Sequence, residues 1–500
     1  MTATDASKTA DNVDVSSPSS AQQPALNYVS PLSTRYASAP MRENFSDVAR
    51  FRLWRKLWAA LAWAEHQLGL QVTQEQVHAL ENAPDVDMQL AKRYEAKLRH
   101  DVMAHVHALG DQVPLARPVI HLGATSCFVT DNSEVMQACH ALDLLIPAVW
   151  RCVSNLAHFA QRYRDLPTLA FTHLQPAQPT TVGKRAALWL QDFLFDAHNL
   201  EHVRRTVRLR GVKGTTGTQA SFLGLFDGDH EKVKKLEALV AQRMGFEQTW
   251  PITGQTYSRK QDFFVLSALA GVGQSAAKMA NDIRLLQHMK EVEEPFAKHQ
   301  IGSSAMPYKR NPMRCERINA LARFLQSLVL NPAETASTQW LERTLDDSAN
   351  RRLSVSEAFL TCDAILQLVL NVSSALVVYP KIIDKHLLQE LPFIATESIL
   401  MAAVQAGGDR QQLHEAIRVH AMRAGARVKE EGAPNDLLQR IAQDELFSSV
   451  RDRLEELCEP ALFVGRAPQQ VDDFLGEHVR PALQERERIL QGDFSGDVRI

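Results

Sequence analysis

The sequence lacks the features that usually mark a membrane-bound or exported protein. No apolar run is long enough to span a bilayer. The first 25 residues hold one lysine, no arginine and no apolar core, which argues against a secretory signal and a mitochondrial leader. Their content of Ser, Ala, Thr, Asp and Gln predicts a disordered tail over residues 1–26.

Cysteine is scarce as well. None of the cysteines forms a Cys-x-x-Cys pair or lies at zinc-like spacing from histidine. Scattered single cysteines are typical of the reducing cytoplasm, where we expect this protein to act. Cys315 lies beside two arginines and could be a nucleophilic thiolate, but no histidine partner is evident nearby, so a structural role is favoured. The cysteines are Cys127, Cys139, Cys152, Cys315, Cys362 and Cys458.

Histidines crowd one predicted helix, over residues 87–109, and raise the question of a metal site. His105 and His107 are two positions apart and point to different sides of a helix. His100 and His107 could share a face, but no cysteine or glutamate stands at ligand spacing from them. We therefore expect no metal, and nothing in the sequence calls for a flavin or a nicotinamide.

Neither sign of charge dominates, and strand patterns are rare. Lys plus Arg is 55 and Asp plus Glu is 58, so the composition implies no general affinity for nucleic acid. Long helical patterns with sparse breaks predict an all-α protein built around a helical bundle. We expect an N-terminal helical domain over 27–125, a central bundle domain over 126–378 and a C-terminal helical domain over 379–500. The predicted helices are 47–72, 87–109, 133–164, 181–210, 229–244, 258–294, 313–330 and 351–378.

The stretch richest in candidate catalytic side chains runs from Gln300 to Arg317, around the break between two of these helices. Gly302 permits backbone conformations that other residues avoid, and Pro307 and Pro312 exclude a continuous helix. The stretch also carries two serines, a lysine and several arginines, which is more than a connector between bundle helices requires. A plain surface turn is the alternative, but these residues favour a mobile catalytic loop.

Other polar breaks carry candidate binding groups that also have an ordinary structural interpretation. Thr125 and Ser126 could cap the next helix, or bind a carboxylate at its N-terminus. Arg35 and Tyr36 could bind a phosphate, although the residues alone favour a helix lead-in. His173 lies in a helix-breaking stretch rich in Gln and Thr.

A glycine-rich segment and an arginine-rich segment raise the possibility of phosphate binding. The first, residues 211–221, lacks the ending and the preceding strand of a P-loop, so we expect a turn between helices. In the second, Ser348 and Arg352 are four positions apart and would share a helical face, with Arg343 about one turn before them. This set could bind a phosphomonoester or form a solvated charged face.

These segments resemble one family. The string Gly-Ser-Ser-Ala-Met-Pro-Tyr-Lys-Arg-Asn-Pro is similar to the signature loop of the fumarase/aspartase superfamily. The strings Thr-His-Leu-Gln-Pro-Ala-Gln and Arg-Thr-Leu-Asp-Asp-Ser-Ala-Asn-Arg-Arg are similar to motifs of its adenylosuccinate lyase family, and the resemblance covers roughly residues 28–490. It implies the three-domain fold of that superfamily. It also implies a carbon–nitrogen lyase of purine nucleotide biosynthesis, which releases fumarate from adenylosuccinate and from succinylaminoimidazole-carboxamide ribotide.

The resemblance also implies roles for individual residues. His173 would be the general acid and Ser303, rather than Ser304, the general base. His100 would orient the substrate, and Lys309 would hold its carboxylates. A serine hydroxyl is a poor acid, so Ser303 needs burial beside Lys309 and backbone N–H groups to act as a base. The resemblance assigns substrate binding to Arg35, Tyr36, Arg99, Asp101, Thr125, Ser126, Thr172, Gln255, Asn311, Arg317, Arg343, Ser348 and Arg352.

The same residues bear on two alternative functions and on the expected oligomeric state. Another fumarate-releasing lyase, such as argininosuccinate lyase, is disfavoured because only a nucleotide substrate needs the arginine-rich phosphate site. A non-catalytic helical scaffold is disfavoured by the intact His173, Ser303 and Lys309. Helices of about 30 residues are roughly 45 Å long, so connections at their opposite ends cannot meet within one chain. We therefore expect a homotetramer whose active sites are shared between subunits, as the resemblance also implies.

Overall fold

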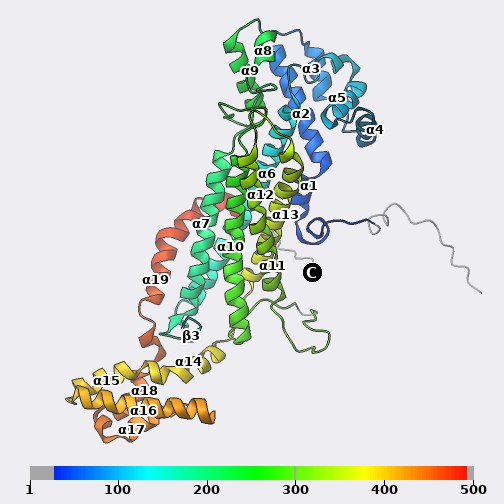
Figure 1. The fold of residues 1–500 in the computed structure, drawn as a ribbon. Coiled ribbons are helices and arrows are strands. Elements are labelled where there is room, and N and C mark those ends of the chain that lie inside the picture. The colour runs from blue at the N-terminus through cyan, green and yellow to red at the C-terminus, as the bar shows by residue number, and fades with distance from the viewer. Residues whose placement is uncertain (1–26, 298–299, 492–500) are drawn as a thin grey trace, which may run out of the picture.

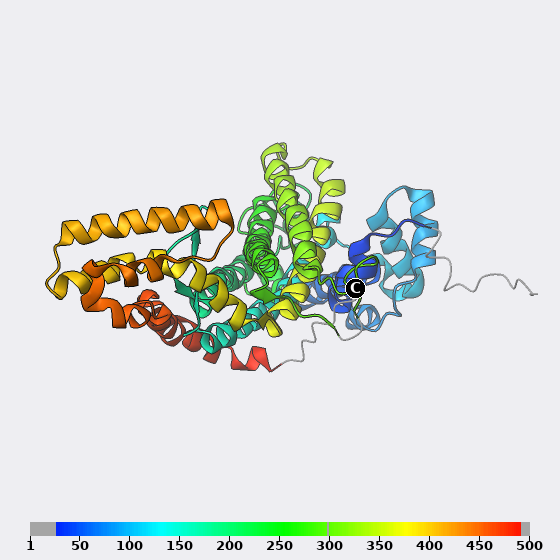
Figure 2. The same cartoon turned by 90° about the horizontal axis from the view of Figure 1, so that it is seen from below.

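The computed structural model describes residues 27–297 and 300–491, and the predicted tail over 1–26 lies outside the described residues. Figure 1 shows a long bundle of helices with a group of shorter helices at each end. Seen from below, the N-terminal and C-terminal groups lie on opposite sides of the bundle (Figure 2). The predicted all-α architecture with a central long-helix bundle is confirmed.

The bundle forms because its long helices carry apolar seams at helical spacing. In α10 the predicted seam of Leu269, Val272, Ala276, Met279, Ile283 and Leu286 is buried throughout. The neighbouring helices pack pairwise along their lengths, with α6 against α7 and α13, and α10 against α7, α11 and α13. The bundle helices are α6 (Ser126–Arg162), α7 (Val182–Thr206), α10 (Lys260–His288), α11 (Met313–Leu328), α12 (Leu330–Thr338) and α13 (Asp346–Ser374).

The N-terminal group packs around its own apolar core, which includes Trp54, Trp58 and Phe222. Two helices from the middle of the chain, α8 and α9, contribute to this core. The elements of this group are α2 (Asp47–Gln67), α3 (Gln74–Glu81), α4 (Met88–Leu98), α5 (Asp101–Gln112), η3 (Pro114–Val119), α8 (Ala220–Leu225) and α9 (His230–Arg243). Before them in the chain, η2 (Leu32–Tyr36) and α1 (Ala39–Asn44) place Leu32 and Met41 in the core of the bundle.

The C-terminal group has a third core that includes Leu413, Ile441 and Phe447. After it, the chain turns back, and α19 runs beside α7 in the bundle (Figure 1). The sequence-based domain boundaries stay a prediction. The elements of the C-terminal group are α14 (Pro380–Ile394), α15 (Thr396–Gln405), α16 (Arg410–Glu431), α17 (Leu437–Gln443), η4 (Glu445–Arg453), α18 (Leu454–Leu457) and η5 (Pro460–Phe463). The elements that return to the bundle are α19 (Ala467–Phe474), η6 (Leu475–Val479), α20 (Arg480–Gln484) and α21 (Glu487–Leu490).

The strands of the described residues are only two residues long and pair as antiparallel ribbons. The pair β2–β3 forms a hairpin, β1 pairs with β4 beside it, and β5 pairs with β6 between the bundle and the C-terminal group. The strands are β1 (Pro167–Thr168), β2 (Phe171–Thr172), β3 (Gln175–Pro176), β4 (Thr180–Thr181), β5 (Val292–Glu293) and β6 (Val377–Val378).

Two sequence-based expectations are wrong. The helix predicted over 87–109 is two helices, because Arg99 takes a left-handed conformation with φ 56° and His100 begins the next helix as its N-cap. The expectation that no helix is long and apolar enough to span a bilayer is also wrong, when only length and composition are considered. In the described residues α10 and α13 have 18-residue windows of mean hydropathy 1.3 and 1.6, and the bent pair α14–α15 passes as a unit. Within α10 and α13, 61% and 72% of those windows are buried inside the protein, so bundle packing accounts for their apolar character.

Candidate active site

Several predicted binding residues lie at the end of the bundle that faces the N-terminal helices. Asp101 begins α5 and forms an ion pair with Arg352 of α13, whose Nη2 lies 3.0 Å from the Asp101 Oδ2. His100, just before it, accepts a hydrogen bond at Nδ1 from the backbone N–H of Met103 at 3.3 Å. The exposed Arg99 precedes both. The structure thus brings together two predicted binding segments that are 251 positions apart.

The start of α6 lies next to the predicted glutamine. Thr125 is the N-cap residue of α6, but its side chain makes no capping hydrogen bond, and Ser126 follows it, half-buried. The thiol of Cys127 donates to the Gln255 Oε1 at 3.6 Å. The Gln255 backbone N–H donates to the carbonyl of Glu342 at 2.9 Å. The start of α6, Gln255 and the segment before α13 therefore meet at one place.

The arginine-rich segment begins α13 as predicted. Ser348 and Arg352 lie four positions apart in this helix, so they share a face. Arg343 lies just before the helix, and its Nη1 is 3.2 Å from the Oδ2 of the buried Asp347. A second predicted phosphate element, Arg35–Tyr36, lies in η2, which packs against the same helix α13.

Tyr36 contacts a residue of the signature stretch. The guanidinium of Arg317 in α11 lies over the Tyr36 ring at 5.4 Å from its centroid, and Arg35 lies 6.0 Å from the same centroid. The Nη1 of Arg317 is buried and has no hydrogen-bond partner among the described residues. Two arginines beside one phenol make a cationic site of the kind that suits a phosphate.

The signature loop folds back on itself. The Ser303 Oγ accepts the backbone N–H of Met306 at 3.2 Å, and the Asn311 side-chain amide donates to the Gly302 carbonyl at 2.7 Å. A Cβ at Gly302 would lie 2.0 Å from the Lys309 carbonyl oxygen, so only glycine fits there. Ser303 is half-buried and the Lys309 side chain is exposed within a single chain.

Where the loop joins α11, it is held by buried polar side chains that the sequence analysis did not predict. The Glu294 carboxylate accepts the backbone N–H groups of Arg314 and Cys315 at 3.0 and 2.9 Å, at the start of α11. The Gln287 side chain donates to the Arg310 carbonyl at 3.1 Å. Burial strongly raises the pKa of the Cys315 thiol, with Glu294 adding to the effect, which favours its structural role over a thiolate nucleophile.

His173 lies at the tip of the β2–β3 hairpin. Thr172 pairs with Gln175, so His173 and Leu174 form a two-residue turn with φ values of 54° and 57°. Such a turn normally takes Asn or Gly, and non-glycine residues held at positive φ store strain that is common at functional sites. Thr172 and His173 are both exposed in the single chain.

One chain does not assemble all the predicted site residues. The hairpin and the signature loop lie toward the end of the bundle near α14, on different sides of it (Figure 1). Asp101, Thr125 and Arg352 belong to elements at the other end, near α5. The chain thus carries separate groups of candidate residues.

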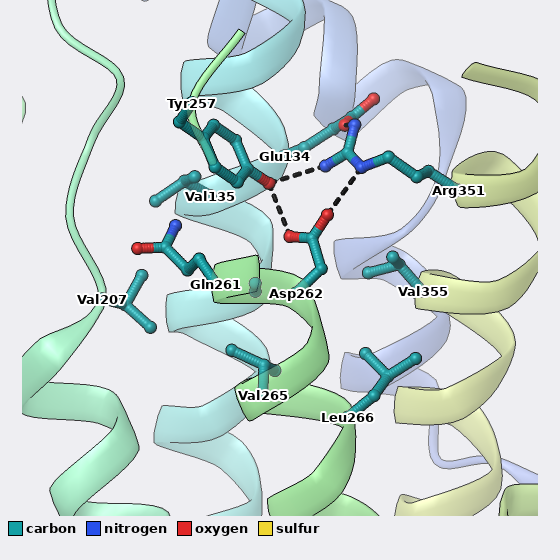
Figure 3. A pocket seen from close by; sticks show the side chains of 11 residues that line it. Glu134, Val135, Val207, Tyr257, Gln261, Asp262, Val265, Leu266, Arg351 and Val355 are labelled. Atoms are coloured by element: carbon teal, nitrogen blue, oxygen red, sulfur yellow. Dashed lines mark hydrogen bonds and ion pairs between the residues drawn. The ribbon is translucent and has the colours of Figure 1, made fainter. Parts of the chain in front are cut away.

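A buried charged network lies beneath the start of α13 and was also missed by the sequence analysis. Figure 3 shows part of it, where Arg351 reaches Asp262, Tyr257 and Glu134. Arg210, fully buried, donates to the carbonyls of Gln255 at 2.5 Å and Gly214 at 2.6 Å, and so fixes the glycine-rich segment against Gln255. The only signal for these residues was their position within or next to predicted binding strings.

The crowded histidines have separate surroundings. His105 is buried and stacks on Phe51 with ring centroids 3.8 Å apart, and burial lowers its pKa to about 4. His107 stacks on Tyr94. Within residues 27–297 and 300–491, no group of three or more His, Cys, Asp or Glu side chains is arranged to hold a metal ion.

Comparisons with known proteins identify the family of this chain. A family model described as Lyase matches residues 35–325, and one described as Adenylosuccinate lyase C-terminus matches residues 392–474. A protein named adenylosuccinate lyase from Saccharomyces cerevisiae is 54% identical over 93% of this chain and 98% of its own length. Its namesake from Schizosaccharomyces pombe is 52% identical over 91% of this chain and 96% of its own.

A solved structure supports the fold. The 3-carboxy-cis,cis-muconate lactonizing enzyme from Pseudomonas putida superposes with a TM-score of 0.77 at 24% identity, covering 92% of this chain and 99% of its own. At 24% identity, this similarity supports the shared fold and not a shared activity. The matching family models and the relatives that align over nearly their full length show that the chain belongs to the adenylosuccinate lyase family.

Proposed function

We propose that this protein cleaves adenylosuccinate to AMP and fumarate, and succinylaminoimidazole-carboxamide ribotide to its carboxamide product and fumarate. The observation that carries the proposal is the 54% identity to a protein named adenylosuccinate lyase along nearly the whole of both chains. The arginine groups at Arg35, Arg317, Arg343 and Arg352 support it, because both substrates carry a ribose phosphate.

The reaction is an elimination that this chain's residues can carry without a cofactor. Ser303, as the alkoxide, takes the proton from the carbon next to a carboxylate. The charge that develops on this carboxylate is stabilised by the Lys309 ammonium and the Asn311 amide. The carbon–nitrogen bond then breaks, and His173 gives its proton to the leaving nitrogen. The products are fumarate and the purine or imidazole nucleotide.

Binding roles fall to the remaining predicted residues. Arg35, Tyr36, Arg343, Ser348 and Arg352 hold the phosphate. Thr125 and Ser126 bind the succinyl part at the start of α6, where the helix N-terminus favours a carboxylate. Further substrate contacts come from Arg99, Asp101, Thr172, Gln255 and Arg317, and His100 orients the substrate and tunes His173.

The active site is shared between subunits of a cytoplasmic homotetramer. The separation of the hairpin, the signature loop and the α5 end within one chain supports this proposal. Exposure of the His173 and Lys309 side chains in the single chain agrees with it, because catalysis by these groups requires that water be excluded around them.

The proposed activity is tested by following fumarate release from the purified protein. We expect release from adenylosuccinate and from the imidazole ribotide, and none from argininosuccinate. Release from argininosuccinate alone would replace this proposal with argininosuccinate lyase activity. Release from none of the three would support a non-catalytic scaffold.

A further inference from the structure

One buried guanidinium joins the starts of three helices, two of which carry predicted binding residues. Arg259, 2% exposed, lies directly before α10. Its Nη1 and Nη2 donate to the two carboxylate oxygens of Asp131 in α6, at 3.1 and 3.0 Å. Its Nε donates to the Oδ2 of Asp347 in α13 at 2.8 Å. The relative position of α6, α10 and α13 is therefore fixed at the end of the bundle where Thr125, Gln255 and Arg352 lie.

Asp347 connects this buried group to the edge of the candidate site. Its side chain is fully buried, whereas the side chain of its second partner, Arg343, is 22% exposed. The same Oδ2 that accepts from Arg259 also accepts from the Arg343 Nη1, at 3.2 Å. A guanidinium has five N–H groups, so a bond through Nη1 leaves donors for a second anion. Asp347 thus orients Arg343 without occupying it.

Arg343 completes a group of two carboxylates and two guanidinium groups that are paired directly with one another. Asp131 and Asp347 contribute two negative charges, and Arg259 and Arg343 contribute two positive charges. Burial opposes ionisation of Asp131, but the combined attraction of Arg259, Arg351 and Arg210 outweighs it and holds the pKa of that carboxyl below its usual value. A buried carboxylate that loses a partner is costly, so Arg343 is held in place strongly.

A second layer fixes the rotation of α13. One turn after Asp347, Arg351 donates to the Asp262 Oδ2 at 2.7 Å and to the Tyr257 hydroxyl at 2.6 Å, and it also pairs with Glu134 (Figure 3). Both buried anchors, Asp347 and Arg351, are followed directly in sequence by a predicted phosphate-binding residue. Ser348 and Arg352 are less buried than the anchors they follow, so the anchors set which residues of α13 face the site.

We propose that Asp347 is a positioning residue for the substrate's phosphate, acting through Arg343. It holds the Arg343 guanidinium in one orientation before the ligand arrives, so that less conformational entropy is lost when a phosphomonoester binds. The inference rests on the proposed function, which assigns Arg343 to the phosphate. It extends that function to a residue that touches no substrate.

The test compares two neighbouring aspartates in the complete protein. Asp347→Asn removes the buried charge, and Asp346→Asn makes the same chemical change at the adjacent, exposed position of the same helical turn. We expect Asp347→Asn to raise the KM for adenylosuccinate roughly tenfold and to weaken inhibition by inorganic phosphate in proportion. The value of kcat and inhibition by fumarate, which carries no phosphate, should change less than about twofold. Asp346→Asn should change none of these.

A double-mutant cycle shows whether the effect passes through Arg343. In an Arg343→Ala background, adding Asp347→Asn should raise KM no further. Additive effects would overturn the proposal. A lower melting temperature of Asp347→Asn with unchanged KM and unchanged phosphate inhibition would overturn it too, because the residue would then be structural only. If Asp347→Asn does not fold, Asp347→Glu against Asp346→Glu makes the same comparison with the charge displaced by one methylene.

The proposed function can fail separately. If the wild-type protein released no fumarate from adenylosuccinate, the substrate assignment would be wrong. Calorimetric titration with inorganic phosphate needs no turnover, and it would still compare the wild type with the Asp347→Asn and Asp346→Asn variants. Equal phosphate affinity in all three would overturn the positioning role.

Discussion

Arg352 is held by a weak partner before any substrate arrives. Its ion pair with Asp101 has an N–O distance of 3.0 Å, but the two side chains are 51% and 32% exposed, so the pair contributes little stability. Arg352 is therefore free to exchange Asp101 for a stronger anion such as a phosphate.

We expect Arg352→Ala to raise KM about tenfold with kcat nearly unchanged, because a contact remote from the reacting bond is equally strong in the ground and transition states. Ser303→Ala should instead lower kcat by at least about 100-fold, the usual contribution of a positioned acid or base. Ser304→Ala is the matched control for the loop. Steady-state kinetics decide the matter, and an unchanged KM in Arg352→Ala would contradict the phosphate assignment.

Glu65 of α2 is a buried acid that costs stability. Both of its carboxylate oxygens are buried without a hydrogen-bond partner among the described residues, and burial raises the pKa of Glu65 to about 9. In the unfolded chain the group titrates near 4.5, so it releases its proton there at lower pH than in the fold. Stability therefore falls as the pH rises from about 4.5 to about 9.

Glu65→Gln should remove this penalty. We expect its melting temperature to exceed that of the wild type by several degrees at pH 8 and by much less at pH 5, since the penalty at pH 8 is on the order of a few kcal/mol. Thermal melts at the two pH values test it, with the exposed Glu430→Gln in α16 as control. An equal difference at both pH values would argue against titration of Glu65.

The sequence predicted candidate site residues better than it predicted the buried residues that hold them in place. Asp101 and Arg352 were both candidates, and the structure pairs them. Asp347, Arg259 and Glu294 were not candidates, because an acidic or basic residue in a polar string has the same pattern whether it faces water or a buried partner. Their distinguishing property is burial, which depends on elements up to 128 positions away.

Breaks between helices, rather than the helices themselves, carry the candidate chemistry. The apolar seam of α10 was predictable because its period is local. The break between α4 and α5 was not, because Arg99 adopts its left-handed conformation in a segment whose residues suit a helix well. The two-residue strands beside His173 were likewise too short for any alternation to show.

The signature loop offers a test at the scale of an element. Gly302→Ala would place a methyl group 2.0 Å from the Lys309 carbonyl oxygen, so the turn that carries Ser303 must open. We expect kcat to fall at least about tenfold with the melting temperature unchanged, because the loop is largely exposed and contributes little to the core.

A second glycine provides the control. Gly425 lies inside α16, and a Cβ there would meet nothing within 4 Å. Gly425→Ala should leave kcat unchanged and raise stability by up to about 1 kcal/mol, through helix propensity alone. Unchanged kcat in Gly302→Ala would mean that the folded-back loop conformation is not the one used in catalysis.

The whole assembly is tested by complementation between two inactive variants. His173→Ala and Ser303→Ala proteins are unfolded, mixed in equal amounts and reassembled. If the two residues of one site come from different chains, about a quarter of the sites in randomly mixed tetramers receive both intact residues. We expect activity to return to roughly a quarter of the wild-type value, measured as fumarate release from adenylosuccinate.

Mass measurement of the reassembled species must show mixed tetramers for the result to count. Each variant refolded alone serves as the baseline. Persistent inactivity of confirmed mixed tetramers would mean that His173 and Ser303 of one site belong to the same chain, contrary to the shared site.

Because α19 packs back onto the bundle, the bundle cannot complete its folding until the last part of the chain has been synthesised. Val471 and Val479 are completely buried in the bundle core, and Arg486 pairs with Glu201 of α7 at 2.7 Å while covering the Trp150 ring. A nascent chain that has emerged only as far as α18 lacks these side chains and still exposes the parts of α6 and α7 that they cover. Apolar surface exposed at this stage makes a partly folded chain prone to aggregation. The bundle therefore closes late, when the ribosome has delivered the segment from α19 to α21.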